Sequence, residues 1–340
     1  MALGYRPMRR EDVRCCARLV ASHPAFARQY GNSRDNLLRA WSKLIGSEGF
    51  RAIVFEETGP AEVRMFGVGV LVFVCDEFVE EAKRSPYFWL GPVLATRVAN
   101  GNSPVLSDAE VRRLNSTGGL NVVPWPLGFR VEDVKRIEVS SLAIGSFIEQ
   151  VRGYRLKEFL AQSPVEEETL AMMGAGCTLA AGGTERTSVD PQTLREIIQQ
   201  PYVIYLRRET ALLSHGSWAG SMFMYEHPKV GFAGSQQKLL IAALHGRTDE
   251  ELAPELEISL SGVKKAWQAI YAKAQAAGLQ GSRCHPSDER GQEKKRSLLA
   301  YVRAHPEELR PVDMKLINRS DEGGEQPFPP SATSRETGIL

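Results

Sequence analysis

A short polar stripe in the C-terminal part of the sequence has the chemistry of a helix face that binds nucleic acid. Its members recur at helical spacing and are Ser261, Lys264, Lys265 and Gln268. Residues three, four and seven positions apart share one face of an α-helix. Lysine can meet a phosphate or a guanine, and glutamine can pair with adenine through two hydrogen bonds. The stripe therefore predicts contact with base edges in a DNA groove.

Apolar residues interleaved with this stripe predict the helix that positions it. They are Val263, Trp267, Ile270 and Ala274, again at helical spacing. Ser259 precedes them and is a favourable N-cap. Because the apolar face must be buried, the polar stripe must look outward.

Two shorter helices are predicted upstream, separated by sharp breaks. Leu239, Leu240, Ala243 and Leu244 give the first an apolar face, and Gly246 supplies the left-handed residue that ends it. Thr248 caps the second helix, and Glu251 completes a capping box. Residues 232–274 therefore predict a tri-helical unit with a helix-turn-helix at its centre.

The same residues resemble, without a gap, the C-terminal DNA-binding domain of LuxR-type transcription regulators. The matching positions are Leu239-Leu240, Gly246-Arg247-Thr248, Glu251-Leu252-Ala253, Leu256-Glu257-Ile258-Ser259, Val263-Lys264-Lys265 and Ile270-Tyr271-Ala272-Lys273. The chain departs from that family at Gly262, where threonine is preferred, and at Pro254, which removes a backbone hydrogen bond from its helix. The resemblance implies an all-α DNA-binding domain over residues 229–280.

Double-stranded DNA is therefore the expected partner. The predicted contact residues are Thr248, Ser259, Ser261, Lys264, Lys265, Gln268 and Lys273, with Thr248 and Lys273 assigned to phosphates. One such unit buries too little surface for tight binding, so we expect a homodimer on two half-sites. Two alternatives stay open: a small helical bundle with a solvated lysine face, and a module that docks to another protein.

The N-terminal region predicts an α/β domain. A strand at residues 4–8, helices at 10–21 and after Ser33, and strands at 50–56 and 63–74 follow one another. This order resembles the start of the GNAT acetyltransferase fold over about residues 1–125, with Tyr5-Arg6-Pro7 opening the strand and Glu11-Asp12-Val13 the helix. We predict an α+β protein whose residues 1–228 hold a mixed or antiparallel sheet and sense a small-molecule or protein effector.

The GNAT family needs a Gln/Arg-x-x-Gly-x-Gly/Ala loop at a helix start, where backbone N–H groups meet the pyrophosphate of acetyl-CoA. The nearest match is at residues 150–155, but Arg155 stands where a small residue is needed. We therefore expect no cofactor, no catalytic residue and no enzymatic activity. The alternative is an acetyl-CoA-dependent N-acyltransferase with an accessory helical domain.

Composition sets the remaining expectations. The 340 residues suggest two or three domains, and a net charge of +1 gives no global field toward nucleic acid or acidic membranes. The five cysteines have no zinc-site spacing, so no metal is expected. Without a signal core or a membrane-length apolar run, we expect a cytoplasmic protein that contacts no membrane.

The remaining segments give four smaller predictions. Residues 131–162 should be largely helical, and Gly67 and Gly69 should mark a bulge or close packing within a strand. His215, two residues from Ser217, is taken as structural. An extra helix lies in 281–317, around Leu298, Leu299 and Val302, and a disordered tail in 318–340.

Overall fold

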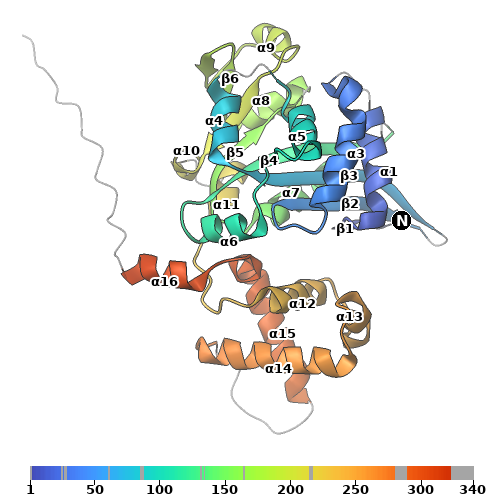
Figure 1. The fold of residues 1–340 in the computed structure, drawn as a ribbon, viewed down its shortest axis with the longest axis vertical. Helices are drawn as coiled ribbons and strands as arrows, with labels where there is room; N and C mark the ends of the chain where they lie inside the picture. Colours follow the sequence, from blue (N-terminus) through green and yellow to red (C-terminus); the bar gives the residue numbers. More distant parts are fainter. Residues whose placement is uncertain are drawn as a thin grey trace, which may run out of the picture.

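The computed structural model describes residues 2–322 except 24–25, 27–28, 60–61, 85–87, 131, 134, 164, 214–216 and 280–288. It shows a sheet domain, running from β1 to α11, and a helical unit, running from α12 to α16, placed end to end (Figure 1). A mixed sheet with many helices makes the chain α+β in class.

The sheet domain is built on eight strands in the order β1-β2-β3-β4-β5-β8-β6-β7. Their bounds are β1 Ala2–Pro7, β2 Phe50–Thr58, β3 Val63–Val74, β4 Leu120–Phe129, β5 Leu156–Ala161, β6 Thr178–Ala181, β7 Thr184–Arg186 and β8 Val203–Arg207. Within these strands β4 and β5 pair in parallel and the other pairs are antiparallel. The expected mixed sheet is therefore confirmed.

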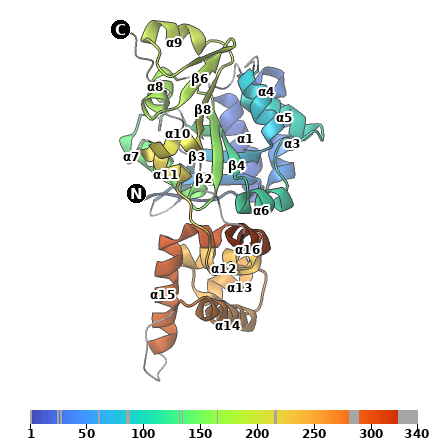
Figure 2. The ribbon, with the colours of Figure 1, turned by 90° about the vertical axis from the view of Figure 1, so that its left-hand side faces the viewer.

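Helices cover both faces of this sheet, as Figure 2 shows. Their bounds are α1 Val13–Ser22, α3 Arg34–Leu44, α4 Asp76–Arg84, α5 Leu90–Ala99, α6 Asp108–Ser116, α7 Ile137–Val151, α8 Glu166–Gly174, α9 Pro191–Ile197, α10 Arg208–Leu213 and α11 Trp218–Phe223. Short 3-10 turns, η1 Arg10–Asp12 and η2 Gly31–Ser33, precede α1 and α3.

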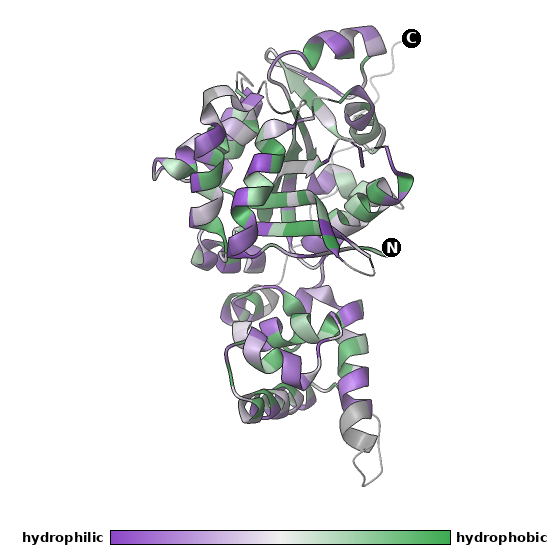
Figure 3. Cartoon of the chain, turned by 90° about the vertical axis from the view of Figure 1, so that its right-hand side faces the viewer, coloured by the Kyte–Doolittle hydropathy of each residue, from purple (hydrophilic) through white to green (hydrophobic). Residues whose placement is uncertain are grey.

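Alternation along β3 divides the core between the two faces. Val70 and Val72 pack with α1, α3 and α5, whereas Leu71 and Phe73 pack with residues of α7 and α11. Successive strand side chains point to opposite faces, so a strand buried on both sides is apolar throughout. Figure 3 shows these apolar strands at the centre of the domain.

The helical unit contains α12 Gly234–Leu244, α13 Asp249–Glu255, α14 Leu260–Ala276, α15 Glu289–Ala304, η3 Pro306–Leu309 and α16 Met314–Glu322. Gly246 has φ 81° after α12, and Thr248 and Ser259 cap α13 and α14 as predicted. The predicted helix around Leu298 and Val302 is α15, and both side chains are buried.

Pro254 is tolerated because α13 is short. The helix ends at Glu255, immediately after the proline. The chain then turns through Glu257, whose φ of 54° is left-handed, while the Ile258 N–H donates to Ala253 O at 2.9 Å. One missing backbone bond in the last turn therefore does not break the unit.

Two predictions about secondary structure need correction. Residues 131–162 are not largely helical, because β5 occupies Leu156–Ala161 and pairs with β4 and β8. The tail is not irregular from residue 318, since α16 continues to Glu322. Residues 323–340 and His215 lie outside the described residues.

The prediction for Gly67 is confirmed. A Cβ at this position would lie 2.3 Å from the Phe129 ring. Close packing, and not a ligand loop, therefore requires the glycine. In the part of the chain that is described, no helix has both the length and the apolar character to cross a membrane.

Candidate nucleic-acid interface

Helix α14 lies on the side of the helical unit farthest from the sheet domain, as both Figure 1 and Figure 2 show. Its buried face is the predicted one: Val263 and Ile270 are fully buried and Trp267 is 4% exposed. The rotation of α14 about its own axis is thus fixed by its apolar residues.

Neighbouring helices hold Trp267 in place. Its Nε1–H donates to Asp249 Oδ1 of α13 at 3.2 Å. Lys295 of α15 lies 4.8 Å from the indole centre and forms an ion pair with the same Asp249 at 2.8 Å. Tyr271 stacks on the indole with ring centroids 5.7 Å apart. Three helices therefore meet at this side chain.

The opposite face of α14 brings the predicted polar stripe together. Ser261, Lys264, Lys265 and Gln268 are all exposed. No ion pair among the described residues involves Lys264 or Lys265. Two adjacent ammonium groups therefore face solvent, and no carboxylate in the described part of the chain forms an ion pair with them.

Thr248 and Ser259 also lie at the surface, and each serves first as a helix cap. Thr248 Oγ1 accepts from the Glu251 N–H at 3.3 Å, and Ser259 Oγ accepts from the Gly262 N–H at 3.1 Å. Ser259 Oγ is also 2.9 Å from Ser261 Oγ. These hydroxyls fix where α13 and α14 begin.

Lys273 does not share the exposed stripe. The side chain is half-buried, and its Nζ donates to Gly231 O in the connection before α12. Twelve positions after Ser261, the residue lies on the flank of the helix and not above Lys264. Its contact ties α14 to that connection.

Acidic residues on α13 are largely paired within the unit. Arg247 lies 3.3 Å from Glu255 and 3.7 Å from Glu251, while Asp249 is bound by Lys295. These ion pairs reduce the negative potential that α13 would otherwise direct at an approaching phosphate.

Sequence analysis missed the buried polar residues that hold the helical unit in place. Glu308, fully buried in η3, accepts N–H bonds from Lys229, Val230 and Gly231 at 2.8–3.1 Å, and Tyr301 OH donates to it at 2.8 Å. Consecutive charged residues normally suggest a solvated turn. Only the fold reveals that this carboxylate organises the connection before α12.

Arg310 joins the helical unit to the sheet domain. Its guanidinium donates to Arg152 O and Glu149 O, both at 2.8 Å, and lies 4.8 Å from the Tyr154 ring. The two acceptors are carbonyls at the C-terminus of α7, where a cation is favoured by the helix dipole. Asn115 Nδ2 adds a bond to Pro311 O at 2.9 Å.

The segment that comes nearest to an acetyl-CoA loop in sequence is part of this junction. Residues 150–155 end α7 instead of beginning a helix. Gly153 has φ 83°, and a Cβ on it would lie 2.5 Å from the carbonyl carbon of Pro306. A helix C-terminus presents carbonyls and negative partial charge, so it is the wrong end for pyrophosphate.

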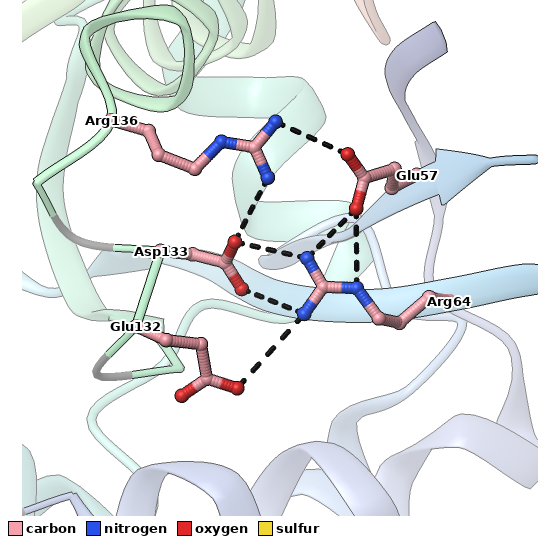
Figure 4. A network of polar contacts seen from close by, with 5 residues as sticks. All are labelled: Glu57, Arg64, Glu132, Asp133 and Arg136. Atoms are coloured by element: carbon pink, nitrogen blue, oxygen red, sulfur yellow. Dashed lines mark hydrogen bonds and ion pairs between the residues drawn. The ribbon is translucent and has the colours of Figure 1, made fainter. Parts of the chain in front are cut away.

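An acetyl-CoA loop of that kind lies between the end of a strand and the start of a helix. The connection from β4 to α7 has this order. Here Asp133 binds Arg64 bidentately at 2.9 and 3.0 Å and Arg136 at 3.0 Å (Figure 4). Glu57 of β2 binds the same two arginines at 2.8 and 3.1 Å. Carboxylates and guanidiniums thus neutralise one another at the start of α7.

These arginines change the titration of the acids. The hydrogen bond from Arg64 is the main reason that the pKa of Asp133 lies below its ordinary value, and Arg136 acts in the same direction. The pKa of Glu57 is lowered by the same two arginines. The network is therefore ionised at neutral pH.

Comparison with known proteins does not identify a function for this site. No family model matches the sequence, and no curated protein matches it. Among solved structures, a point mutant of the spermidine N-acetyltransferase SpeG from Vibrio cholerae matches with a TM-score of 0.32 and 10% identity. The match covers 60% of this chain and 94% of that chain. A likeness of this size transfers no activity to the chain.

The comparison nevertheless corrects one expectation. We expected no enzymatic activity, and a solved structure that matches the chain is that of an N-acetyltransferase. The expectation is therefore not retained.

Proposed function

We propose that this chain is a DNA-binding transcription regulator of the LuxR-type helix-turn-helix class. The observation that carries the proposal is the division of α14 into two faces. Trp267 and its apolar neighbours are buried, while Lys264 and Lys265 are exposed without an acidic partner among the described residues. A helix held this way presents cations and an amide to a DNA groove.

The predicted contact residues fall into two groups, one for base edges and one for phosphates. Lys264, Lys265 and Gln268, with Ser261 beside them, contact base edges in this proposal. Thr248 and Ser259, which cap α13 and α14, contact phosphates in this proposal and fix the register on DNA.

The sheet domain supplies regulation in the same proposal, by binding a small-molecule or protein effector. Arg310 and Asn115 tie it to the helical unit through hydrogen bonds that are buried or partly buried. A homodimer would place two copies of α14 on two half-sites and give tighter binding than one copy.

Fluorescence anisotropy of a labelled random-sequence duplex tests the proposal with the full chain. We expect saturable binding at low salt that weakens steeply as salt is raised, because phosphate contacts release counterions. Selection from a random DNA pool should then yield a two-part site. No binding to any duplex at low salt would contradict the proposal and favour the protein-docking alternative.

One structural feature keeps a second candidate function, acetyl-CoA-dependent N-acyl transfer. Among the described residues, β4 pairs with β5 from Leu120 to Val122, and beyond that point it continues to Phe129 paired with β3. Parallel strands that separate at their carboxyl ends create a position where ligands bind. A rise in melting temperature that saturates with acetyl-CoA would support this candidate.

A further inference from the structure

Three side chains with metal-binding atoms converge where the connection between the two parts meets the end of α15. They are Glu226, His305 and Glu307, and one ligand atom from each lies within 4.8 Å of the other two. Sequence spacing hid this group, because Glu226 is some eighty positions from the other two residues.

The fold fixes this arrangement from both sides. His305 directly follows α15, and its ring lies 4.5 Å from the Tyr301 ring one helical turn earlier. Glu307 belongs to η3. Glu226 belongs to the connection between α11 and α12, which Glu308 holds against η3 through the N–H groups of residues 229–231.

Electrostatics at this position favour a cation. Glu307 is 7% exposed, and its carboxylate meets His305 Nδ1 at 2.9 Å, a contact that is an ion pair only when the imidazole is protonated. Glu308, the next residue, is fully buried as well, and its carboxylate is already bound by three backbone N–H groups and the Tyr301 hydroxyl. Buried carboxylates are costly unless paired or bound to metal, and Glu226 adds a third acid to the same place.

We propose that Glu226, His305 and Glu307 bind a divalent transition-metal ion, with Zn²⁺ the best match. One imidazole and two carboxylates are a ligand set that zinc accepts, and three protein ligands leave a coordination position for water. The ion would take the place of the hydrogen now shared between Nδ1 and Glu307, so that Nδ1 offers its lone pair and Nε2 carries the proton. It would fasten the connection to η3.

Calorimetric titration with Zn²⁺ tests this proposal on the tag-free full chain after treatment with a chelator. We expect one site per chain. Glu226→Gln and His305→Gln should each weaken binding by about tenfold or more, as removal of metal-site residues does. His245→Gln is the matched control, because it removes an exposed histidine of the same unit at the end of α12.

Glu226→Gln is the decisive variant, because an exposed linker residue can change without unfolding the chain. Equal zinc affinity in this variant and the parent would overturn the proposal, as would no saturable binding. Co²⁺ provides a second readout: an intense near-ultraviolet thiolate band would place the ion on cysteines and overturn it. None of these measurements involves DNA, so failure here is distinguishable from failure of the proposed function.

Discussion

Two clusters of charged residues in this chain use their charges in opposite ways. At the start of α7, Arg64 and Arg136 are bound to Glu57 and Asp133, and each carboxylate meets both arginines. On α14, Lys264 and Lys265 are exposed, with no acid paired to them among the described residues. The first cluster is closed by its own hydrogen bonds, and the second is open to a partner.

The difference separates structural from binding charges. A bidentate arginine–carboxylate pair fixes geometry and leaves little charge for a ligand. An unpaired lysine contributes little to folding but attracts phosphate over a Debye length. Arg64 and Arg136 thus hold a loop in the sheet domain. Lys264 and Lys265, in our proposal, bind DNA from the helical unit.

The largest expected effect tests which face of α14 is buried. Trp267→Ala removes a side chain that is 4% exposed and bound to Asp249, so it should cost about 3–5 kcal/mol of stability in the helical unit. Denaturant unfolding followed by circular dichroism measures it. Trp267→Phe should lose clearly less. Equal stability of Trp267→Ala and the parent would mean that the helix faces the other way.

The open cluster is tested by the combined changes Lys264→Ala and Lys265→Ala. We expect affinity for duplex DNA to fall about tenfold or more, because each base contact that is lost costs about 1–3 kcal/mol. The salt dependence should also become shallower, because two ammonium charges no longer displace counterions from the DNA. Folding should not change, because both side chains are exposed. Anisotropy at several salt concentrations measures both effects.

The matched control removes two exposed lysines elsewhere on the helical unit, Lys238 and Lys315. If Lys238→Ala with Lys315→Ala weakens binding as much, net charge and not the α14 face carries the interaction.

The closed cluster is tested through acid. Arg64 holds the pKa of Asp133 below its ordinary value, so this acid stabilises the fold at neutral pH, and that contribution is lost as pH falls through the lowered pKa. Between neutral pH and about pH 3, the parent should therefore lose more stability than Asp133→Asn. Chemical unfolding at each pH gives the difference.

Glu132→Gln is the control for that experiment. Glu132 belongs to the same loop, but its side chain is 63% exposed and its carboxylate lies 4.0 Å from Arg64, a longer distance than the Asp133 contacts. Its loss should leave the pH dependence near that of the parent. An identical pH dependence for Asp133→Asn and the parent would show that the cluster does not stabilise the fold.

The smallest expected effect concerns Gly262, in the first turn of α14. A Cβ there would meet Ile258 and Ser259 at 3.4 Å, which is ordinary contact. Gly262→Ala should therefore stabilise the helical unit by about 0.5–1 kcal/mol through the lower entropy of the unfolded chain. DNA affinity should not change. A loss of stability would show that the turn from α13 to α14 packs more tightly than these distances indicate.

Sequence reasoning worked best where neighbouring residues decide the structure. Thr248 and Ser259 cap their helices, Gly246 ends α12, and Trp267 lies on the buried face. Each result depends on contacts three or four positions apart, which a sequence pattern displays directly. Among the predicted contact residues, Lys273 was placed differently, because its acceptor, Gly231 O, comes from a distant segment.

The local sequence pattern predicted the wrong secondary structure where contacts with distant segments decide it. Leu156–Ala161 was expected to be helical after an interruption near Gly153, but hydrogen bonds to β4 and β8 hold it as a strand between them. Strand pairing is a non-local contact, so no short window of sequence displays it.

The sequence by itself determined α12, α13 and α14, the caps of α13 and α14 and the face of α14 that is buried, because periodicity and capping act within one or two turns. Tertiary structure alone decided the order of the strands, the end of α7 at which Gly153 lies, and the partners of Arg310 and Glu308. The physical reason is that a buried charge is tolerated only where the fold brings donors or acceptors to it, and those come from residues far along the chain.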